Sequence, residues 1–216
     1  MKHFTHCKTE FIKPLRHAAL ALFLVGGLGA CDPVSLTVGA AATTGVAAYQ
    51  ERGIKGVAQD SATEARILKL WFDKDPNIIP LVSVEVYEGR ALITGIVQTE
   101  EMRADAIGLA WKAEGVTDVL NEVIVGEASG FGELAHDTTI TAELKSKLTF
   151  DDQVFAVNYA VETVRGTVYL IGIAQDQAEL DRVISQARNI SYVKKVISHV
   201  RVKAPGEGAP KKASGS

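Results

Sequence analysis

The chain has 216 residues, with 23 basic and 26 acidic side chains, and its formal net charge is −3 at pH 7. This length is sufficient for one ordinary domain or two small ones. A slightly acidic chain is a poor general ligand for nucleic acid, and basic pairs such as Lys194 and Lys195 are too sparse to form a binding patch, so we expect no nucleic-acid partner.

The first thirty residues have the composition of a secretory signal. Basic side chains precede an uncharged apolar run from Ala18 to Ala30, which is too short to span a bilayer. The small residues before Cys31 resemble a lipobox, the signal that directs diacylglyceryl transfer to a cysteine and cleavage just before it. Cys31 is then the first residue of the mature chain. An ordinary secreted protein with a free Cys31 thiol is the alternative.

Lipidation of Cys31 predicts permanent attachment to a membrane, because each buried methylene stabilises insertion by about 0.8 kcal/mol and lipoproteins carry more than one acyl chain. We expect the periplasmic face of the outer membrane. The inner membrane is the alternative, since Asp32 follows the cysteine and an aspartate there favours retention in the inner membrane of enterobacteria. Cys7 lies in the removed segment, so the mature chain forms no internal disulfide.

Composition separates the folded part of the chain from its two ends. Residues 31–60 are mostly rich in Ala, Gly and Thr and poor in charge, which is typical of a tether or of a weak helix near the headgroups. Residues 204–216 are rich in Pro, Gly and Ser, which predicts a disordered tail.

An internal repeat organises the rest. Sliding the chain by 77 positions aligns residues 61–125 with 138–202 without a gap. Glycines and apolar residues coincide in this alignment, including Gly89 with Gly166 and Gly95 with Gly172. We therefore predict two copies of one small domain, at 61–127 and 137–203.

Each copy reads as helix, strand, strand, helix, strand. Ser61 and Glu64 form a capping box at the start of the first helix, Gly89 closes a hairpin, and Thr99 caps the second helix. The expected helices and strands of the first copy are 61–72, 81–89, 91–97, 100–115 and 116–125, and those of the second are 137–148, 157–174 (a hairpin), 175–190 and 193–202. Structural turn roles are assigned to Gly89, Gly95, Gly166 and Gly172. The prediction is an α+β fold in which two helices cover one face of a three-stranded mixed sheet.

These features resemble the BON-domain family. The resemblance rests on the hairpin glycine, the glycine near the end of the second strand in "YEGRALITG" and "VRGTVYLIG", and the valine-rich last strand "VTDVLNEVIV". Two such units behind a lipobox and an Ala-rich tether, over residues 28–203, resemble the dual-BON envelope lipoproteins. The resemblance implies a non-enzymatic protein that binds anionic phospholipid and supports outer-membrane integrity, with no cofactor.

Charge differs between the copies in a way that bears on membrane contact. Residues 61–127 hold six basic and twelve acidic side chains, whereas residues 137–203 hold nine basic and eight acidic. Only the second copy can approach an anionic bilayer without marked repulsion. Its first helix shows a small, hydroxyl-rich face with one ammonium group, which is the candidate lipid-binding site: Thr139, Ala142, Lys145, Ser146 and Thr149. An ordinary solvated face is the alternative.

Lipid insertion is expected to be weaker than in the lipid-binding relatives. The resemblance implies a large aromatic near the start of this helix, and this chain has Thr139 there. The other large aromatics receive separate predictions: Trp71 belongs to the core, Trp111 lies at an interface, and Phe131 packs one domain on the other, with lipid contact as its alternative. A helix of one domain is expected to cover the sheet of the other.

Catalysis finds no support in the sequence. His136 and His199 are the only histidines after residue 30, without metal-ligand spacing around them, and the adjacent Asp151 and Asp152 diverge on a turn. We expect no enzyme activity and no metal. The functional alternative to lipid binding is a protein-binding adaptor or a chaperone-like envelope stress protein that recognises an envelope protein.

Overall fold

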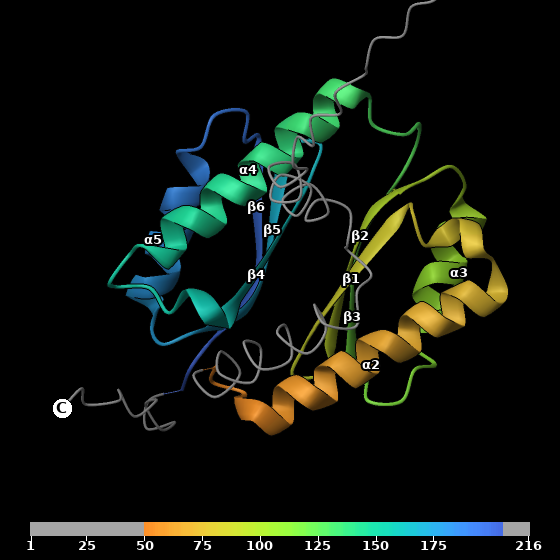
Figure 1. Ribbon diagram of the computed structural model, residues 1–216, viewed down its shortest axis with the longest axis horizontal. Helices are drawn as coiled ribbons and strands as arrows, with labels where there is room; N and C mark the ends of the chain where they lie inside the picture. The colour runs from red at the N-terminus through yellow and green to blue at the C-terminus, as the bar shows by residue number, and fades with distance from the viewer. Residues whose placement is uncertain (1–49, 205–216) are drawn as a thin grey trace, which may run out of the picture. The chain divides into compact units, whose positions relative to one another are not determined.

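The computed structural model describes residues 50–204 (Figure 1). The predicted lipidation site Cys31, the predicted tether before Gln50 and the tail after Ala204 lie outside the described residues, and the predictions made for them stay predictions.

The first domain contains two helices and a three-stranded sheet of order β1-β2-β3, in which β1 and β2 are antiparallel and β2 and β3 are parallel. Its elements are α2 (Gly53–Lys74), a 3₁₀ turn η1 (Pro76–Ile78), β1 (Val82–Tyr87), β2 (Arg90–Val97), α3 (Glu100–Ala110) and β3 (Asp118–Val125).

The second domain repeats this topology, with sheet order β4-β5-β6, an antiparallel β4–β5 pair and a parallel β5–β6 pair. Its elements are α4 (Phe131–Thr149), η2 (Ala156–Asn158), β4 (Tyr159–Val164), β5 (Thr167–Ala174), α5 (Gln177–Arg188) and β6 (Lys195–Val202). The predicted α+β fold of two tandem units, each a mixed sheet with two helices, is confirmed.

The first helix of each domain begins earlier than predicted. Helix α2 starts at Gly53, so Ser61 lies inside the helix and no capping box forms there. Residues 53–60 are thus helical and do not belong to the tether. Helix α4 likewise starts at Phe131. The cap at Thr99 is confirmed, because its side chain accepts the N–H of Met102 at 3.2 Å.

Each domain has its own hydrophobic core between its helices and one face of its sheet. In the first core, Ile67 and Trp71 are fully buried, and the indole N–H of Trp71 donates to the carbonyl of Ala106 at 2.9 Å. The prediction that Trp71 is a core residue is confirmed. Ile140, Leu144 and Leu148 of α4 are buried in the second core in the same way.

The four repeat glycines have two different roles. Gly89 and Gly166 have φ values of +75° and +76° in the two hairpin turns, as predicted. Gly95 and Gly172 lie within β2 and β5 instead of turns, which corrects their assignment. A Cβ at Gly172 would lie 1.9 Å from the carbonyl oxygen of Asn158, so this position needs glycine because the preceding strand approaches its backbone.

A third cluster of buried side chains joins the two sheets. Its members come from both domains: Tyr87, Leu92, Tyr169, Ile171 and Ile173. Strands β2 and β5 are therefore buried on both faces, which explains why both are largely apolar. The prediction that a helix of one domain covers the sheet of the other is wrong, because the sheet faces themselves form this contact.

Candidate membrane-contact site

The predicted lipid-binding residues lie on the solvent side of α4. Thr139, Ala142, Lys145, Ser146 and Thr149 are all exposed. The buried row Ile140, Leu144 and Leu148 holds the opposite side of the helix on the sheet. The structure thus brings the five predicted residues together on one helix and leaves them accessible to a ligand.

The threonine hydroxyls on this face are already used as donors. Thr139 donates its hydroxyl proton to the carbonyl of Ala135 at 2.8 Å, and Thr149 donates to the carbonyl of Lys145 at 2.7 Å. Such back-bonding is common for threonine within helices. A lipid phosphate has to compete with these carbonyls for the proton, so Lys145 is the principal attraction for an anion on this face.

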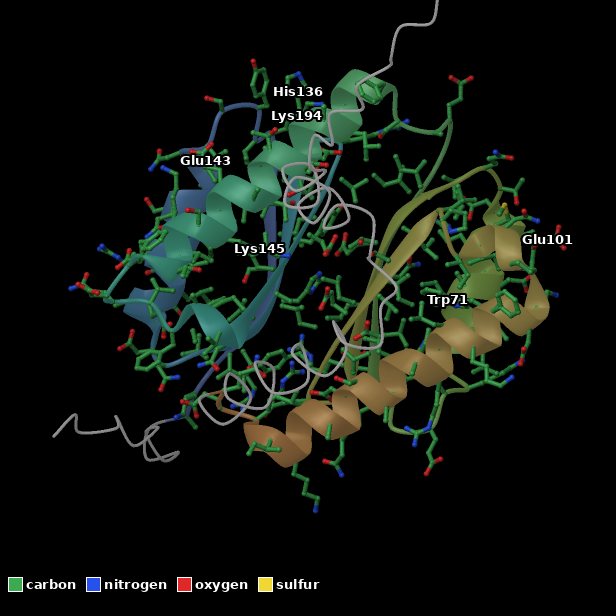
Figure 2. All side chains as sticks on the ribbon, in the orientation of Figure 1. Trp71, Glu101, His136, Glu143, Lys145 and Lys194 are labelled. Carbon is green, nitrogen blue, oxygen red and sulfur yellow. The ribbon has the colours of Figure 1, made fainter. Side chains whose placement is uncertain are left out.

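Lys145 lies at one side of the face. Lys145 and Glu143 leave α4 on opposite sides (Figure 2). The ammonium group of Lys145 is close enough to lower the pKa of both Glu162 on β4 and Glu85 on β1. The charge of Lys145 therefore acts both on the exposed helix face and on two carboxylates beside the contact between the two sheets.

These carboxylates are ionisable groups in an apolar layer. Glu85 and Glu162 stand opposite Leu92 and Tyr169 in their ladders, and both of those side chains belong to the cluster that joins the sheets. Burial, followed by the charges of Glu162 and Glu64, raises the pKa of Glu85 to about 7. Burial also raises the pKa of Glu162.

Replacing Glu85 with glutamine should make stability less dependent on pH. The pKa of Glu85 is higher in the folded protein than in the unfolded chain. The protonated side chain therefore does not reduce the free energy of unfolding below about pH 4.5, whereas ionisation of the carboxyl reduces this free energy as the pH rises through about 7. We expect Glu85→Gln to raise the free energy of unfolding by about 2 kcal/mol at pH 8 and to have little effect at pH 4. Urea denaturation at both pH values measures this; an equal effect at the two values would contradict it.

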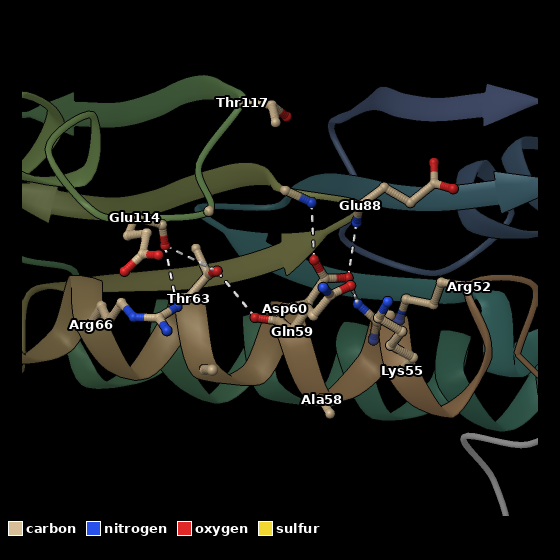
Figure 3. Close-up of a pocket in the computed structure, with 14 residues that line it drawn as sticks. Arg52, Lys55, Ala58, Gln59, Asp60, Thr63, Arg66, Glu88, Glu114 and Thr117 are labelled. Carbon is tan, nitrogen blue, oxygen red and sulfur yellow. Dashed lines mark hydrogen bonds and ion pairs between the residues drawn. The ribbon is translucent and has the colours of Figure 1, made fainter.

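A buried aspartate anchors the hairpin turn in each domain, and the sequence analysis missed both residues. Asp60 accepts the backbone N–H groups of Glu88 and Gly89, each at 2.9 Å, and it also accepts a hydrogen bond from Arg52 at 2.6 Å (Figure 3). Arg52 additionally donates to the carbonyl of Val86 at 2.8 Å. Asp60 therefore ties the first helix to the turn between β1 and β2.

Asp137 repeats this arrangement in the second domain. It accepts the N–H groups of Arg165 and Gly166, each at 2.7 Å. Asp60 and Asp137 are separated by the 77-residue offset of the repeat, and Asp60 immediately precedes the aligned stretch. Extending the alignment by one residue would have identified the pair.

An ion pair and hydrogen bonds connect the start of the described chain to the second domain. We call the four residues that form them the clasp: Glu51, Asn158, Gln175 and Lys203. Glu51 pairs with Lys203 at 2.9 Å, and both side chains are nearly buried, at 10% and 6% exposed. The Gln175 amide donates to Glu51 at 2.8 Å, and the backbone N–H of Glu51 donates to Asn158 at 3.0 Å. Glu51, two positions before α2, is thus held by the second domain.

The two histidines have structural partners. His199 lies 2.8 Å from Glu122 on β3, and His136 stacks on Tyr192 with ring centroids 4.0 Å apart. Within residues 50–204, no three metal-ligating side chains lie close enough to hold an ion. Across the same residues, no helix is both long and apolar enough to cross a bilayer.

Phe131 and Trp111, which were both predicted to make contacts, are exposed. The prediction that Phe131 packs one domain on the other is wrong, because its side chain is 90% exposed at the start of α4. Trp111 is 52% exposed after α3, so its predicted interface would have to involve a partner outside the described residues.

Comparisons with known proteins agree with the repeat. The family model described as BON domain matches residues 74–127 and 136–204. The chain is 31% identical over 189 residues to outer membrane lipoprotein DolP of Haemophilus influenzae, which covers 86% of this chain and 95% of that protein. It is 32% identical over 149 residues to osmotically-inducible protein Y of Escherichia coli, covering 67% and 73%. It is also 39% identical over 145 residues to an uncharacterized protein of Anaplasma centrale, covering 67% and 95%.

Proposed function

The chain belongs to the BON-domain family as a dual-BON envelope protein of the DolP/OsmY type, and from this premise we propose that it is a lipid-anchored protein whose second domain binds anionic phospholipid. Its anchor is a diacylglyceryl group on Cys31, its location is the periplasmic face of the outer membrane, and its role is to support envelope integrity without catalysis.

The observation that carries this proposal is the exposed face of α4 on the less acidic domain. The first domain has an excess of six acidic side chains over residues 61–127, whereas the second has an excess of one basic side chain over residues 137–203. Each basic group near an anionic membrane contributes about 1 kcal/mol of attraction. The exposure of Lys145 on this helix supports α4 as the side of the second domain that faces lipid headgroups.

Vesicle binding by the chain from residue 32 to 216 tests the proposal. We expect tighter binding to vesicles that contain phosphatidylglycerol than to vesicles of phosphatidylcholine alone, and we expect Lys145→Glu to weaken binding to the former by roughly tenfold. Lys69→Glu is the matched control, because Lys69 is an exposed lysine on α2 of the acidic domain. Equal binding to both vesicles together with no effect of Lys145→Glu would remove the proposal.

A protein-binding adaptor is the second candidate, and one observation favours it. The first domain exposes three large apolar side chains, Ile54 at 52%, Phe72 at 60% and Trp111 at 52%, on a domain too acidic to approach an anionic bilayer. Crosslinking in cells followed by purification separates the candidates. An adaptor retains one stoichiometric protein partner when Lys145 is changed to Glu, and loses it when Trp111 is changed to Ser.

A further inference from the structure

The two domains meet through positions that the repeat relates to one another. Leu92 and Tyr169, which both belong to the cluster that joins the sheets, are separated by the 77-residue offset. Glu122 and His199 have the same separation, and the Nε2 of His199 lies 2.8 Å from a carboxylate oxygen of Glu122. Equivalent positions of the two copies therefore lie near each other where the domains meet.

Two carboxylates occupy one such pair of positions. Glu85 on β1 and Glu162 on β4 are also 77 residues apart, and each is half-buried. Side chains directly opposite in a sheet ladder share a face, so the ladder partners Leu92 and Tyr169 place both carboxylates on the faces that form the contact. We call Glu85 and Glu162 the carboxylate pair. The contact thus holds two groups of the same charge at equivalent positions of its two sides.

The charged groups around the carboxylate pair come from both domains. Glu64 of α2 is a third carboxylate, and its charge, like that of the other member of the pair, opposes ionisation of Glu85. Lys145 of α4 favours ionisation of both members of the pair. Arg52 also favours ionisation of Glu85, but it is already paired with another carboxylate at 2.6 Å. Tyr169 of β5 stays uncharged, because burial raises the pKa of its hydroxyl. Ionisation of both members is therefore opposed by burial and by their mutual repulsion.

Loss of protons from the carboxylate pair weakens the contact between the sheets. Burial and neighbouring carboxylates raise the pKa of Glu85 to about 7 while the sheets are packed, and burial raises the pKa of Glu162. Separation of the sheets returns both groups to water, where the pKa of a glutamate is about 4.5. Between about pH 4.5 and 7 the packed state thus binds more protons than the separated state, so a rise in pH across this range favours separation.

The bond between Glu122 and His199 changes in the same direction, because it is an ion pair only while the imidazole is protonated. Other bonds between the domains do not depend on this proton. Arg90 donates to the carbonyl of His199 at 2.9 Å, and Arg201 pairs with Glu88 at 3.2 Å. Two contacts at equivalent positions of the repeat therefore weaken together as the pH rises.

We propose that the contact between the sheets is a pH-controlled latch, which is closed while Glu85 and His199 are protonated and opens when they lose their protons, with each domain still folded. Each domain keeps its own core beneath its helices when the sheets separate. Residues 126–130, which connect β3 to α4, include two glycines and supply the hinge. Opening uncovers the apolar cluster on both sheets. The latch needs no lipid, so it stands independently of the proposed function.

Thiol labelling at two positions of strand β2 tests the latch. The chain has no cysteine after Cys31, so peptide mass spectrometry can follow one introduced thiol in the full chain. Thr94 is 1% exposed and lies two positions from Leu92, which places it on the face toward the other sheet. Val97 is fully buried in the core of the first domain, on the opposite face of the strand. Thr94→Cys therefore reports opening of the latch, and Val97→Cys reports unfolding of the domain.

A pyridyl disulfide reagent labels the thiols at pH 5 and at pH 8, and Ser185→Cys, at an exposed position, corrects for the effect of pH on thiol reactivity. We expect the corrected labelling rate at position 94 to rise at least about tenfold over this range, and to exceed the rate at position 97 at pH 8 by a similar factor. Equal rates at the two positions would mean that the sheets separate only when the domain unfolds. That result, or a rate at position 94 that does not change with pH, would overturn the latch.

Glutamine variants assign the effect to the carboxylate pair. Glutamine keeps the shape of glutamate without its charge, so Glu85→Gln should reduce the rise at position 94 by at least about threefold, and the addition of Glu162→Gln should reduce it further. Any rise that remains should disappear when His199→Gln is added. Glu101→Gln is the matched control, because Glu101 is an exposed carboxylate on α3, and the rise should be unchanged in this variant. A rise of full size without both members of the pair would overturn their role.

Discussion

Asp60→Ala is expected to lower the free energy of unfolding by about 4 kcal/mol, because it leaves three donors without their acceptor. Two of these donors are the backbone N–H groups of Glu88 and Gly89, and the third is Arg52. The Asp60 side chain is 8% exposed, and that of Arg52 is 14% exposed, so water does not replace the lost bonds easily. Urea denaturation followed by tryptophan fluorescence measures the change, because Trp71 is buried in the same domain.

The duplicated domain supplies a graded comparison for this effect. Asp137→Ala removes two backbone acceptor contacts and no arginine pair, so its expected cost is about 2 kcal/mol. Asp73→Ala removes only an exposed partner of Lys69 and should change stability by less than about 0.5 kcal/mol. If the Asp60 and Asp73 variants were equally stable, the hairpin anchor would have no energetic importance.

Gly172→Ala is expected to destabilise the second domain by at least about 3 kcal/mol. The added Cβ would lie 1.9 Å from the carbonyl oxygen of Asn158, which is backbone and cannot rotate away. The φ of +149° at Gly172 adds strain for any residue with a side chain. Circular dichroism in urea measures the loss, since the second domain contains no tryptophan.

Gly95→Ala and Gly108→Ala serve as comparisons for the stability of Gly172→Ala. A Cβ at Gly95 would lie 2.2 Å from the carbonyl oxygen of Leu81, so a loss of similar size is expected in the first domain. Gly108 is helical and has open space around a Cβ, so Gly108→Ala should stabilise the protein by up to about 1 kcal/mol. A Gly172→Ala variant as stable as Gly108→Ala would mean that β4 can move away from β5 at little cost.

Periodicity and the repeat predicted the local structure well. The strands, the hairpin glycines and the Thr99 cap depend on neighbouring residues, and a glycine at Gly89 or Gly166 marks its turn directly. The helix starts were misplaced because Ser61 and Glu64 match a capping box, whereas the side chain of Asp60 binds the distant hairpin turn and the helix continues through it.

The contact between the sheets was the main error of the sequence analysis, although a signal for it was present. Strands β2 and β5 carry apolar side chains on both faces, as in Leu92 and Ile93, which are both buried. Such a strand needs cover on both sides, but the sequence does not say whether a helix or another sheet provides it. Long-range partners of this kind are decided by tertiary packing.

The candidate residues on α4 were predicted from helical spacing alone, and their exposure agrees with that spacing. Spacing could not predict that Thr139 and Thr149 donate to the helix backbone, because a threonine hydroxyl rotates between solvent and carbonyl. It also could not predict the charge environment of Lys145, since Glu85 and Glu162 approach it through the fold.

The clasp at Glu51 has a mechanical consequence for an anchored protein. Any pull on the chain from its amino-terminal side passes through Glu51 and Arg52, where Glu51 is bonded to Lys203 just after the last strand and Arg52 to Asp60 of the first helix. Tension is thereby divided between both domains before it can unwind either one. In a chain anchored as proposed, movements of the bilayer would therefore load both domains through this point.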